Sequence, residues 1–330
     1  MRSIDIHSHI EVPEVTRWSR EIKVRGQGPG KRNWVPKESR SAHGAHSDSI
    51  SEKLRNPESR LADLDRMGID IQVVSMNLPT PVYWARKELG GKIARICNDG
   101  VAEFVSKIPD RFVGLGSLPF QDIKGSVREL NYLTEKLDLR GVQGPSNVRN
   151  QDLGEKRFWP LWAEFEKLGV PLIIHPRGFT HDDRLHKFFL WNTIGQPLEE
   201  SLAMASFVHS GVMDKFPDLK VVISHGGGYL PYYSGRGDRA FESRPEPGQN
   251  ITRYPSEYLK LFFYDSVVFD PDMLSRLVSV AGPDRVMMGT DYPRGETEED
   301  PVGFVSSANL GAAEFDQIAT LNALKLFRIN

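Results

Sequence analysis

Cysteine is nearly absent from the chain. Cys97 is the only cysteine among 330 residues, which excludes an internal disulfide framework and a thiolate-rich zinc cluster. A chain with a single thiol is typical of a reducing compartment, so we expect a cytoplasmic protein.

Long apolar runs and an excess of one charge are absent as well. No run approaches the roughly 18 apolar residues that a membrane span requires, and Arg2 and Asp5 interrupt the region where a signal peptide would be apolar. The formal net charge is −2 and the basic residues are scattered, so there is no basic field for a polyanion. We therefore expect neither a membrane nor a nucleic acid as partner.

What the chain does have is an alternation of short apolar segments with segments of helical periodicity. The apolar segments start near Ser3, Ile69, Phe112, Arg140, Val170, Leu219, Lys260 and Arg285. Helical spacing is found over 58–67, 93–107, 127–137, 158–168 and 198–208. Runs such as 171–174 and 221–223 are apolar on both faces, as expected for strands buried in a parallel sheet.

This alternation predicts an α/β fold, a single (β/α)8 TIM barrel domain over residues 1–330, with a doubly wound open sheet as the weaker alternative. His9, His175, His225 and Asp291 stand at the ends of apolar segments one, five, six and eight. These four ends meet at one mouth only if the sheet closes, which favours the barrel. The sequence contains no internal repeat or interdomain linker.

Two stretches interrupt the alternation of predicted strands and helices. Residues 11–56, after the first strand, are long and polar, and residues 178–196 follow the fifth strand. Connections in such folds usually have about 4 to 6 residues. Because the loops after barrel strands line the active mouth, we expect 11–56 to be an insertion that forms a lid or a pocket wall, and 178–196 to lie over the same mouth.

The residues at the strand ends have the character of metal ligands. Side chains in a strand alternate with period two, so His7 and His9 point the same way and can bind one ion together. His175 and Asp291 add imidazole nitrogen and carboxylate oxygen, which zinc accepts at about 2.0 to 2.2 Å while leaving a position for water. We expect one divalent ion, zinc first and manganese as the alternative.

His225 has two possible roles. It precedes three glycines, where substrate or backbone can approach closely, and it is either a fifth ligand or an acid/base beside the ion. Its ordinary pKa of about 6.5 suits the acid/base role, which we favour. Strand four, residues 140–144, has no lysine or glutamate that would bridge two ions, so a single ion is the more economical reading.

Seven motifs carry a resemblance to a known family. They lie at 5–9, 111–116, 141–143, 174–176, 215–217, 225–228 and 289–293. With these motifs the chain resembles the decarboxylase branch of the amidohydrolase superfamily (amidohydrolase family 2), in particular the 2-amino-3-carboxymuconate-6-semialdehyde decarboxylases. The motifs cover nearly the whole chain apart from the two irregular stretches.

The resemblance implies a zinc ion held by the four predicted ligands, with His225 as catalytic acid/base and Asp291 in the catalytic centre. In this family an arginine eleven residues after the catalytic histidine enters the neighbouring subunit's pocket and binds the substrate carboxylate. That spacing lands on Arg236, with Arg239 as the alternative on the same segment. A homodimer is therefore implied.

Two departures from the family indicate a related but different acid. Counting back without a gap from residues 56–58, a substrate-binding arginine is replaced by Asp48, and an anion cannot hold a carboxylate as a guanidinium does. After His175 and its proline the family often has an aromatic residue, whereas this chain has Arg177. We expect Arg177 to bind substrate, with an ion pair to Asp182 or Asp183 as the alternative. Trp191 and Phe179 are expected to stack on a planar substrate, although a role in capping the mouth is equally open.

These observations lead to three hypotheses. The first is a metal-dependent, non-oxidative decarboxylase of a small aromatic or muconate-semialdehyde-type carboxylic acid. The second is a hydrolase of a ring-cleavage product, lactone or amide, because a metal hydroxide beside a histidine attacks such bonds as well. The third is a metal-dependent binding protein, which would have no need of a proton carrier such as His225.

Overall fold

The computed structural model describes residues 2–22, 44–76, 81–177 and 184–329. Eight parallel strands form one sheet in the order β1-β2-β3-β4-β7-β8-β9-β10. Their bounds are β1 (Ile4–His9), β2 (Ile71–Ser75), β3 (Phe112–Gly116), β4 (Gly141–Gly144), β7 (Leu172–Ile174), β8 (Val221–Ile223), β9 (Phe263–Asp265) and β10 (Val286–Met287). A separate antiparallel pair consists of β5 (Asn147–Val148) and β6 (Gln151–Asp152). Each strand of the main sheet starts within three residues of its predicted start.

The first and last strands of the sheet lie side by side. The backbone N–H of Ile6 donates to the carbonyl of Met288 at 2.9 Å, and that of His9 donates to the carbonyl of Tyr292 at 2.7 Å. Ser8 and Tyr292 also form a parallel bridge. These contacts nearly close the sheet, which confirms the (β/α)8 barrel over the open sheet.

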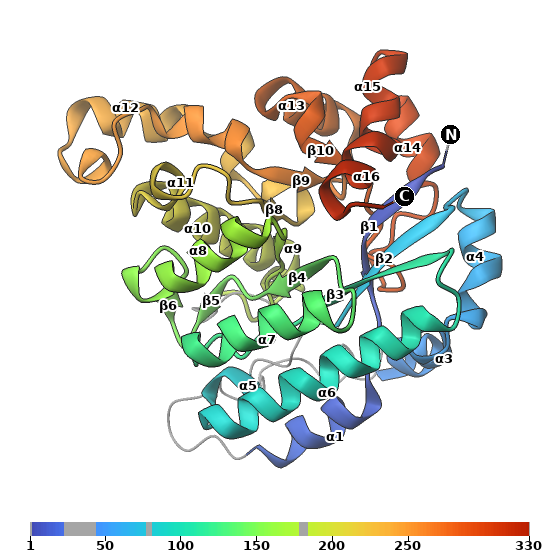
Figure 1. The fold of residues 1–330 in the computed structure, drawn as a ribbon. Coiled ribbons are helices and arrows are strands. Elements are labelled where there is room, and N and C mark those ends of the chain that lie inside the picture. The colour runs from blue at the N-terminus through green and yellow to red at the C-terminus, as the bar shows by residue number, and fades with distance from the viewer. Residues whose placement is uncertain (1, 23–43, 77–80, 178–183, 330) are drawn as a thin grey trace.

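Helices surround the strands (Figure 1). Those that lie between successive strands of the sheet include α4 (Leu61–Arg66), α6 (Lys87–Ser106), α7 (Ile123–Glu135), α8 (Trp159–Leu168), α10 (Gly195–His209), α12 (Gly235–Ser243) and α13 (Pro271–Ala281). Further helices are α5 (Pro81–Trp84), α9 (Leu190–Thr193), α11 (Val212–Lys215), α14 (Pro301–Ser307), α15 (Ala312–Asp316) and α16 (Asn322–Phe327). Within the described ranges, no helix has both the length and the apolarity needed to cross a bilayer.

The described residues also contain 3-10 turns and a π-helical segment. The 3-10 turns are η1 (Glu58–Arg60), η2 (Lys156–Phe158), η3 (His225–Gly227), η4 (Leu230–Tyr232), η5 (Glu246–Gly248), η6 (Pro255–Leu261) and η7 (Pro283–Arg285). The π-helical segment is η8 (Gln317–Leu321). Of these, η3 matters most for the site, because it places His225 directly after β8.

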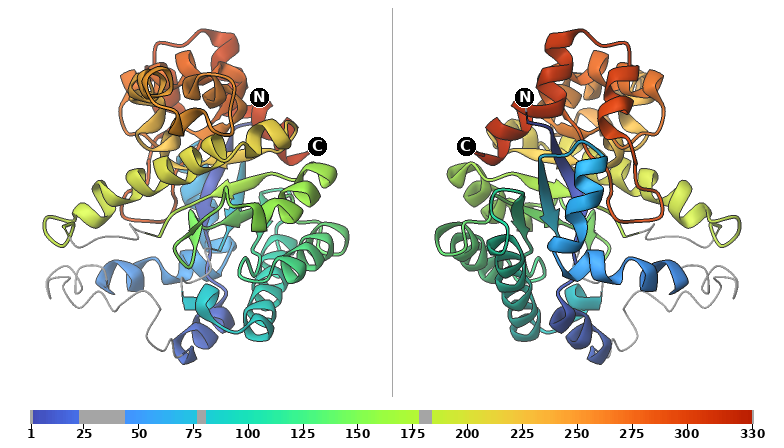
Figure 2. Two further views of the ribbon diagram at one scale, coloured as in Figure 1. Left: turned by 90° about the vertical axis from the view of Figure 1, so that its left-hand side faces the viewer. Right: turned by 90° about the vertical axis from the view of Figure 1, so that its right-hand side faces the viewer.

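Apolar side chains fill the barrel interior. Inward residues of the strands form one cluster, which contains Ile4, Ile6, Ile71, Val73, Leu115, Ile173, Val222 and Met287. Leu326 and Phe327 of α16 join this cluster and close the end of the barrel where the two termini lie together (Figures 1 and 2). The polar ends of the strands are consequently left at the opposite mouth.

The described parts of residues 11–56 are helical, which differs from the irregular polar loop that the sequence suggested. Helix α1 (Pro13–Glu21) lies against α6, and residues 44–49 and α3 (Ser51–Arg55) lead back to the barrel (Figure 1). Val15 and Leu54 are buried, so both ends of this stretch pack into the core. Its role as a lid or pocket wall stays a prediction, and residues 23–43 lie outside the described residues.

Candidate metal centre

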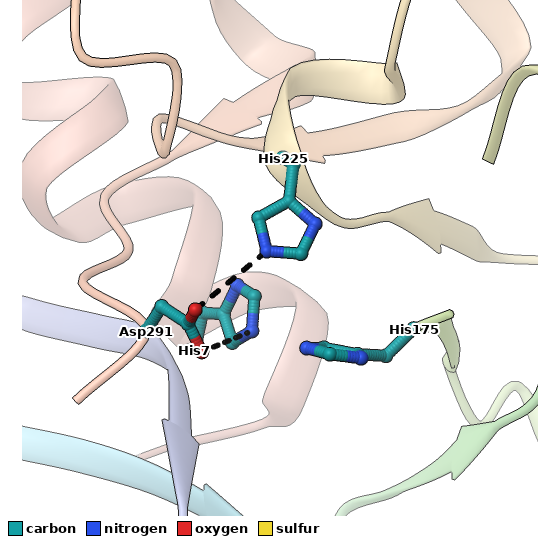
Figure 3. Close-up of side chains that lie close together, drawn as sticks. All are labelled: His7, His175, His225 and Asp291. Carbon is teal, nitrogen blue, oxygen red and sulfur yellow. Dashed lines mark ion pairs between the residues drawn. The ribbon is translucent and has the colours of Figure 1, made fainter. Parts of the chain in front are cut away.

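Three histidines and an aspartate converge at the carboxyl ends of the barrel strands. His7 comes from β1, His175 follows β7, His225 follows β8 and Asp291 follows β10. One donor atom from each residue can be chosen so that all four atoms lie within 4.8 Å of one another. Figure 3 shows the four side chains pointing toward a common centre.

His9, the second histidine of β1, lies at the edge of this cluster. Its Nε2 is 2.8 Å from Asp291 Oδ1, and its ring centroid is 4.8 Å from that of His175. The set of mutually close donors thus includes His225 and omits His9, whereas the sequence led us to name His9 as a ligand and His225 as acid/base. All five predicted residues are brought to one place, and their division of roles stays a prediction.

Hydrogen bonds orient three of the imidazole rings in the same sense. The Nδ1 of His7 lies 2.7 Å from Asp265 Oδ2, and the Nδ1 of His225 lies 2.6 Å from Glu200 Oε1. The Nδ1 of His175 lies 2.7 Å from the carbonyl of the next residue. Because these acceptors take a proton from Nδ1, the Nε2 of each ring faces the centre, and in His7 and His175 its lone pair is available to a metal ion.

The pKa values of the four histidines shift in two directions. Against the effect of burial, Asp265 and Asp291 raise the pKa of His7, and Glu200 and Asp291 raise that of His225 well above its usual value. Burial lowers the pKa of His9 to about 4 against the opposing effect of Asp291, and burial together with His9 holds the pKa of His175 well below its usual value. These two rings are therefore neutral, as metal ligands must be. Burial alone would raise the pKa of Asp291, but hydrogen bonds from His225 and His9 hold it well below its usual value, so the carboxylate is ionised.

One buried nitrogen of the cluster has no hydrogen-bond partner among the described residues. The Nε2 of His7 is buried and has no hydrogen-bond partner among the described residues, and it lies 3.4 Å from Asp291 Oδ1. Buried polar atoms without a partner are costly, and a bound cation would satisfy this one. Imidazole nitrogens with a carboxylate are ligands that zinc and manganese accept, so the donor set fits a single divalent ion.

A buried aspartate holds the backbone beneath the ligands. Asp5 Oδ1 accepts from the backbone N–H of His7 at 2.9 Å, while Oδ2 accepts from Gln72 Nε2 at 2.8 Å and Thr290 Oγ1 at 2.7 Å. Burial raises the pKa of Asp5 to about 6 despite these bonds. Asp5 thereby connects β1, β2 and the segment after β10 at the level of the site.

A fully buried arginine holds the end of β1 from the other side. Arg60 donates through Nη1 to Gln72 Oε1 at 2.7 Å, through Nε to the carbonyl of Lys53 at 2.6 Å and through Nη2 to the carbonyl of His9. Its guanidinium carbon lies 5.1 Å from the centre of the Tyr292 ring. Burial lowers the pKa of Arg60 to about 10, so the group keeps its charge at neutral pH.

Two of the converging residues have a sparsely populated backbone conformation. His225 has φ +49° and Asp291 has φ +59°, both in the left-handed region that non-glycine residues seldom adopt. Such conformations persist only where the surroundings enforce them, and they are concentrated at functional sites. Their occurrence at these two positions supports a function for this mouth of the barrel.

The residues predicted to bind substrate come from loops and helices around the ligands. Arg177 is exposed two residues after His175. Trp191 is partly buried in α9, where its ring contacts that of Phe189 at 5.0 Å, and Arg236 is exposed in α12. Phe179 lies outside the described residues.

Sequence reasoning did not find Asp265, Glu200 or Arg60. Asp265 ends the apolar run of β9 just as the ligands end theirs, and this position could have identified it. Glu200 lies inside a helix and Arg60 inside a helical turn, where charged residues are ordinarily solvated, so no local signal marked them.

A family model described as amidohydrolase matches residues 4–329. Because the match extends over nearly the whole chain, the chain belongs to this family, and the resemblance inferred from the motifs is confirmed.

Several proteins that the chain is similar to are named as decarboxylases. The 2-amino-3-carboxymuconate-6-semialdehyde decarboxylase of Dictyostelium discoideum is 35% identical over 88% of this chain and 81% of its own length. The crystal structure of 5-carboxyvanillate decarboxylase from Sphingomonas paucimobilis has a TM-score of 0.85 and 27% identity, with 100% of this chain and 99% of that one covered. The enzyme of the same name from Novosphingobium aromaticivorans, complexed with manganese and 4-hydroxy-3-methoxy-5-nitrobenzoic acid, has a TM-score of 0.85 and 25% identity over 99% of this chain and 96% of its own.

Proposed function

We propose that this amidohydrolase-family protein is a metal-dependent, non-oxidative decarboxylase that acts on a small aromatic or muconate-semialdehyde-type carboxylic acid. The observation that carries the proposal is the pairing of a buried ligand set with His225, whose Nε2 lies 3.8 Å from Asp291 Oδ2. A proton carrier directly beside a cation site is what removal of a carboxylate from a conjugated carbon requires. The names of the relatives support the same reaction class.

In this mechanism the chain positions the acid and supplies a proton. A bound divalent ion would be held by His7, His9, His175 and Asp291, and its chemistry would be to attract substrate oxygens and stabilise negative charge as it develops. His225 transfers the proton on Nε2 to the ring or chain carbon that bears the carboxylate. The carbon–carbon bond then breaks, its electron pair restores the conjugated π system that protonation had interrupted, and carbon dioxide leaves.

The ion itself is proposed to be zinc, with manganese as the alternative. Imidazole with one carboxylate is a common ligand set for zinc, whereas manganese is bound in the Novosphingobium relative. Elemental analysis of protein purified without added metal separates the two, and about one ion per chain is the expected content.

Substrate recognition is proposed to involve Arg177, Trp191 and Phe179, together with Arg236 of a neighbouring subunit in a homodimer. Arg236 is exposed and makes no ion pair within the described part of the chain, whereas Arg239 pairs with Glu242 at 2.6 Å. A guanidinium without an ion-pair partner among the described residues can bind a carboxylate, so we propose that Arg236 rather than Arg239 binds the carboxylate of the substrate in the neighbouring subunit.

The substrate acid is proposed to differ from the muconate semialdehyde. Asp48, at the position where the resemblance leads us to expect an arginine, is exposed in the helical segment 44–49. A carboxylate there would repel an acidic substrate, so we propose that Arg177 binds the substrate carboxylate instead. The cytoplasmic location also stays a proposal, based on the single cysteine.

Product analysis in labelled water tests the reaction class. Aromatic and muconate-type acids are incubated with metal-loaded protein in D2O, and the expected product has lost CO2 and carries one deuteron on carbon. Incorporation of ¹⁸O from labelled water into an acid product would instead indicate hydrolysis. His225→Ala should lower turnover about 100-fold or more while retaining metal. His209→Ala serves as control, because the Nδ1 of His209 lies 3.2 Å from the Pro247 carbonyl and His209 is not among the clustered residues.

A further inference from the structure

A buried carboxylate contacts His225 on the side of the ring opposite to Asp291. Glu200 of α10 places Oε1 2.6 Å from His225 Nδ1, and the residue is 0% exposed. Its other oxygen, Oε2, is buried and has no hydrogen-bond partner in the described part of the chain. His225 is therefore the one side chain to which this carboxylate is bound among those residues.

The helix that carries Glu200 is held firmly against the His225 segment. The backbone N–H of Tyr229 donates to Ser201 Oγ at 2.8 Å. Gly228 approaches α10 so closely that a Cβ atom there would lie 2.1 Å from the carbonyl oxygen of Pro197. With the backbones of α10 and of the segment after β8 fixed to each other, the Glu200 carboxylate has little freedom to leave His225.

This contact determines which nitrogen of His225 carries the exchangeable proton. Burial raises the pKa of Glu200 to about 7, and the neighbouring His225 opposes this rise. In its ionised form the carboxylate only accepts hydrogen bonds, so the Nδ1 of His225 at 2.6 Å is then the protonated partner. We propose that Glu200 is a positioning residue that keeps the proton on His225 Nδ1 and thereby makes Nε2 the atom that exchanges a proton with the substrate. The inference rests on the acid/base role given to His225 in the proposed function.

Two replacements of Glu200 separate its charge from its acceptor oxygen. In Glu200→Gln the amide oxygen can still accept from Nδ1–H, because Oε2 has no partner that would oppose rotation of the amide. Glu200→Leu removes the acceptor oxygen and puts an apolar side chain of similar size in its place. General acid–base catalysis contributes about 10²- to 10⁴-fold, so we expect kcat to fall roughly tenfold in the first and about 100-fold or more in the second, with KM within about twofold.

A double-mutant comparison tests whether Glu200 acts through His225. If it does, Glu200→Leu should have no further effect on kcat in a His225→Ala background, since the group that it positions is gone. Equal losses in both backgrounds would overturn the proposal. Glu129→Gln is a matched control, because this buried carboxylate is bound to Arg95 at 2.8 Å between two outer helices.

A spectroscopic measurement tests the proposal without any turnover. In zinc-loaded protein with ¹⁵N-labelled histidine, the ring signals of His225 are assigned by their loss in His225→Ala. They should report a protonated Nδ1 in the wild type and in Glu129→Gln, and a changed tautomer in Glu200→Leu. Unchanged signals in Glu200→Leu would refute the positioning role. If the wild type gave this signature but decarboxylated no acid, the proposed function would fail and the orientation of His225 would stand.

Discussion

Replacing Asp265 by asparagine tests how much the carboxylate behind His7 contributes to metal binding. Asp265 accepts hydrogen bonds on both sides: Oδ2 from His7 Nδ1 at 2.7 Å, and Oδ1 from the backbone N–H groups of Gly226 and Val267 at 3.0 and 3.1 Å. An asparagine amide has one accepting end and one donating end. It therefore cannot replace the carboxylate on both sides at once.

Either orientation of the amide weakens the site. If the amide nitrogen faces His7, Nδ1 must accept, the ring proton moves to Nε2, and the nitrogen that points into the cluster can no longer bind an ion. If the amide nitrogen faces Gly226 and Val267, two backbone bonds are lost beside His225. Loss of an outer partner of a ligating histidine typically costs about 10- to 100-fold in metal affinity, which corresponds to about 1.4 to 2.7 kcal/mol.

Competition with a chelator of known affinity measures this effect. We expect the metal Kd of Asp265→Asn to rise about 10- to 100-fold, with most of the activity restored at saturating metal. Asp214→Asn is the control, because Asp214 binds Arg253 at 2.7 Å and Tyr258 at 2.5 Å, and neither partner belongs to the predicted ligand set. A metal Kd within about twofold of the wild type would refute the reasoning, since the scale expected of an outer partner is larger.

Three further perturbations follow from the same structure. Arg60→Met leaves the carbonyls of Lys53 and His9 without their buried charged donor, so we expect a loss of about 3 kcal/mol in urea unfolding; an unchanged midpoint would contradict this. Gly228 has φ +63°, and an added Cβ would lie 2.1 Å from the Pro197 carbonyl oxygen, so Gly228→Ala should lower the free energy of unfolding by at least about 2 kcal/mol. At Gly235 an added Cβ would meet nothing within 4 Å, so Gly235→Ala should leave the free energy of unfolding nearly unchanged. Chelation should abolish turnover and lower Tm by several degrees, because an ion at about 100 times its Kd contributes about 2.7 kcal/mol to the stability of the fold. Readdition of zinc or manganese should restore both turnover and Tm. A Tm that does not change with chelator would argue against a bound ion.

Much of the barrel was predictable because its signals are local. Two-sided apolar runs such as those of β7 and β8 mark buried parallel strands wherever they occur, and polar residues directly after such runs fall at the same end of the sheet. His7, His175 and Asp291 could be placed together for this reason alone. The helical ends of residues 11–56 were missed, because their polar composition hid the few buried residues, such as Val15 and Leu54, that hold them to the core.

The amino-acid sequence by itself determined which donor atoms stand at the strand ends and that the strands alternate with helices, since both depend on neighbours a few residues apart. The tertiary structure decided which side chains stand behind those donors. His7 and Asp265 are 258 residues apart, and His225 and Glu200 are 25 apart on different elements. Only the closing of the sheet between β1 and β10, and the packing of α10 on the segment after β8, brings each carboxylate within hydrogen-bond distance of its histidine.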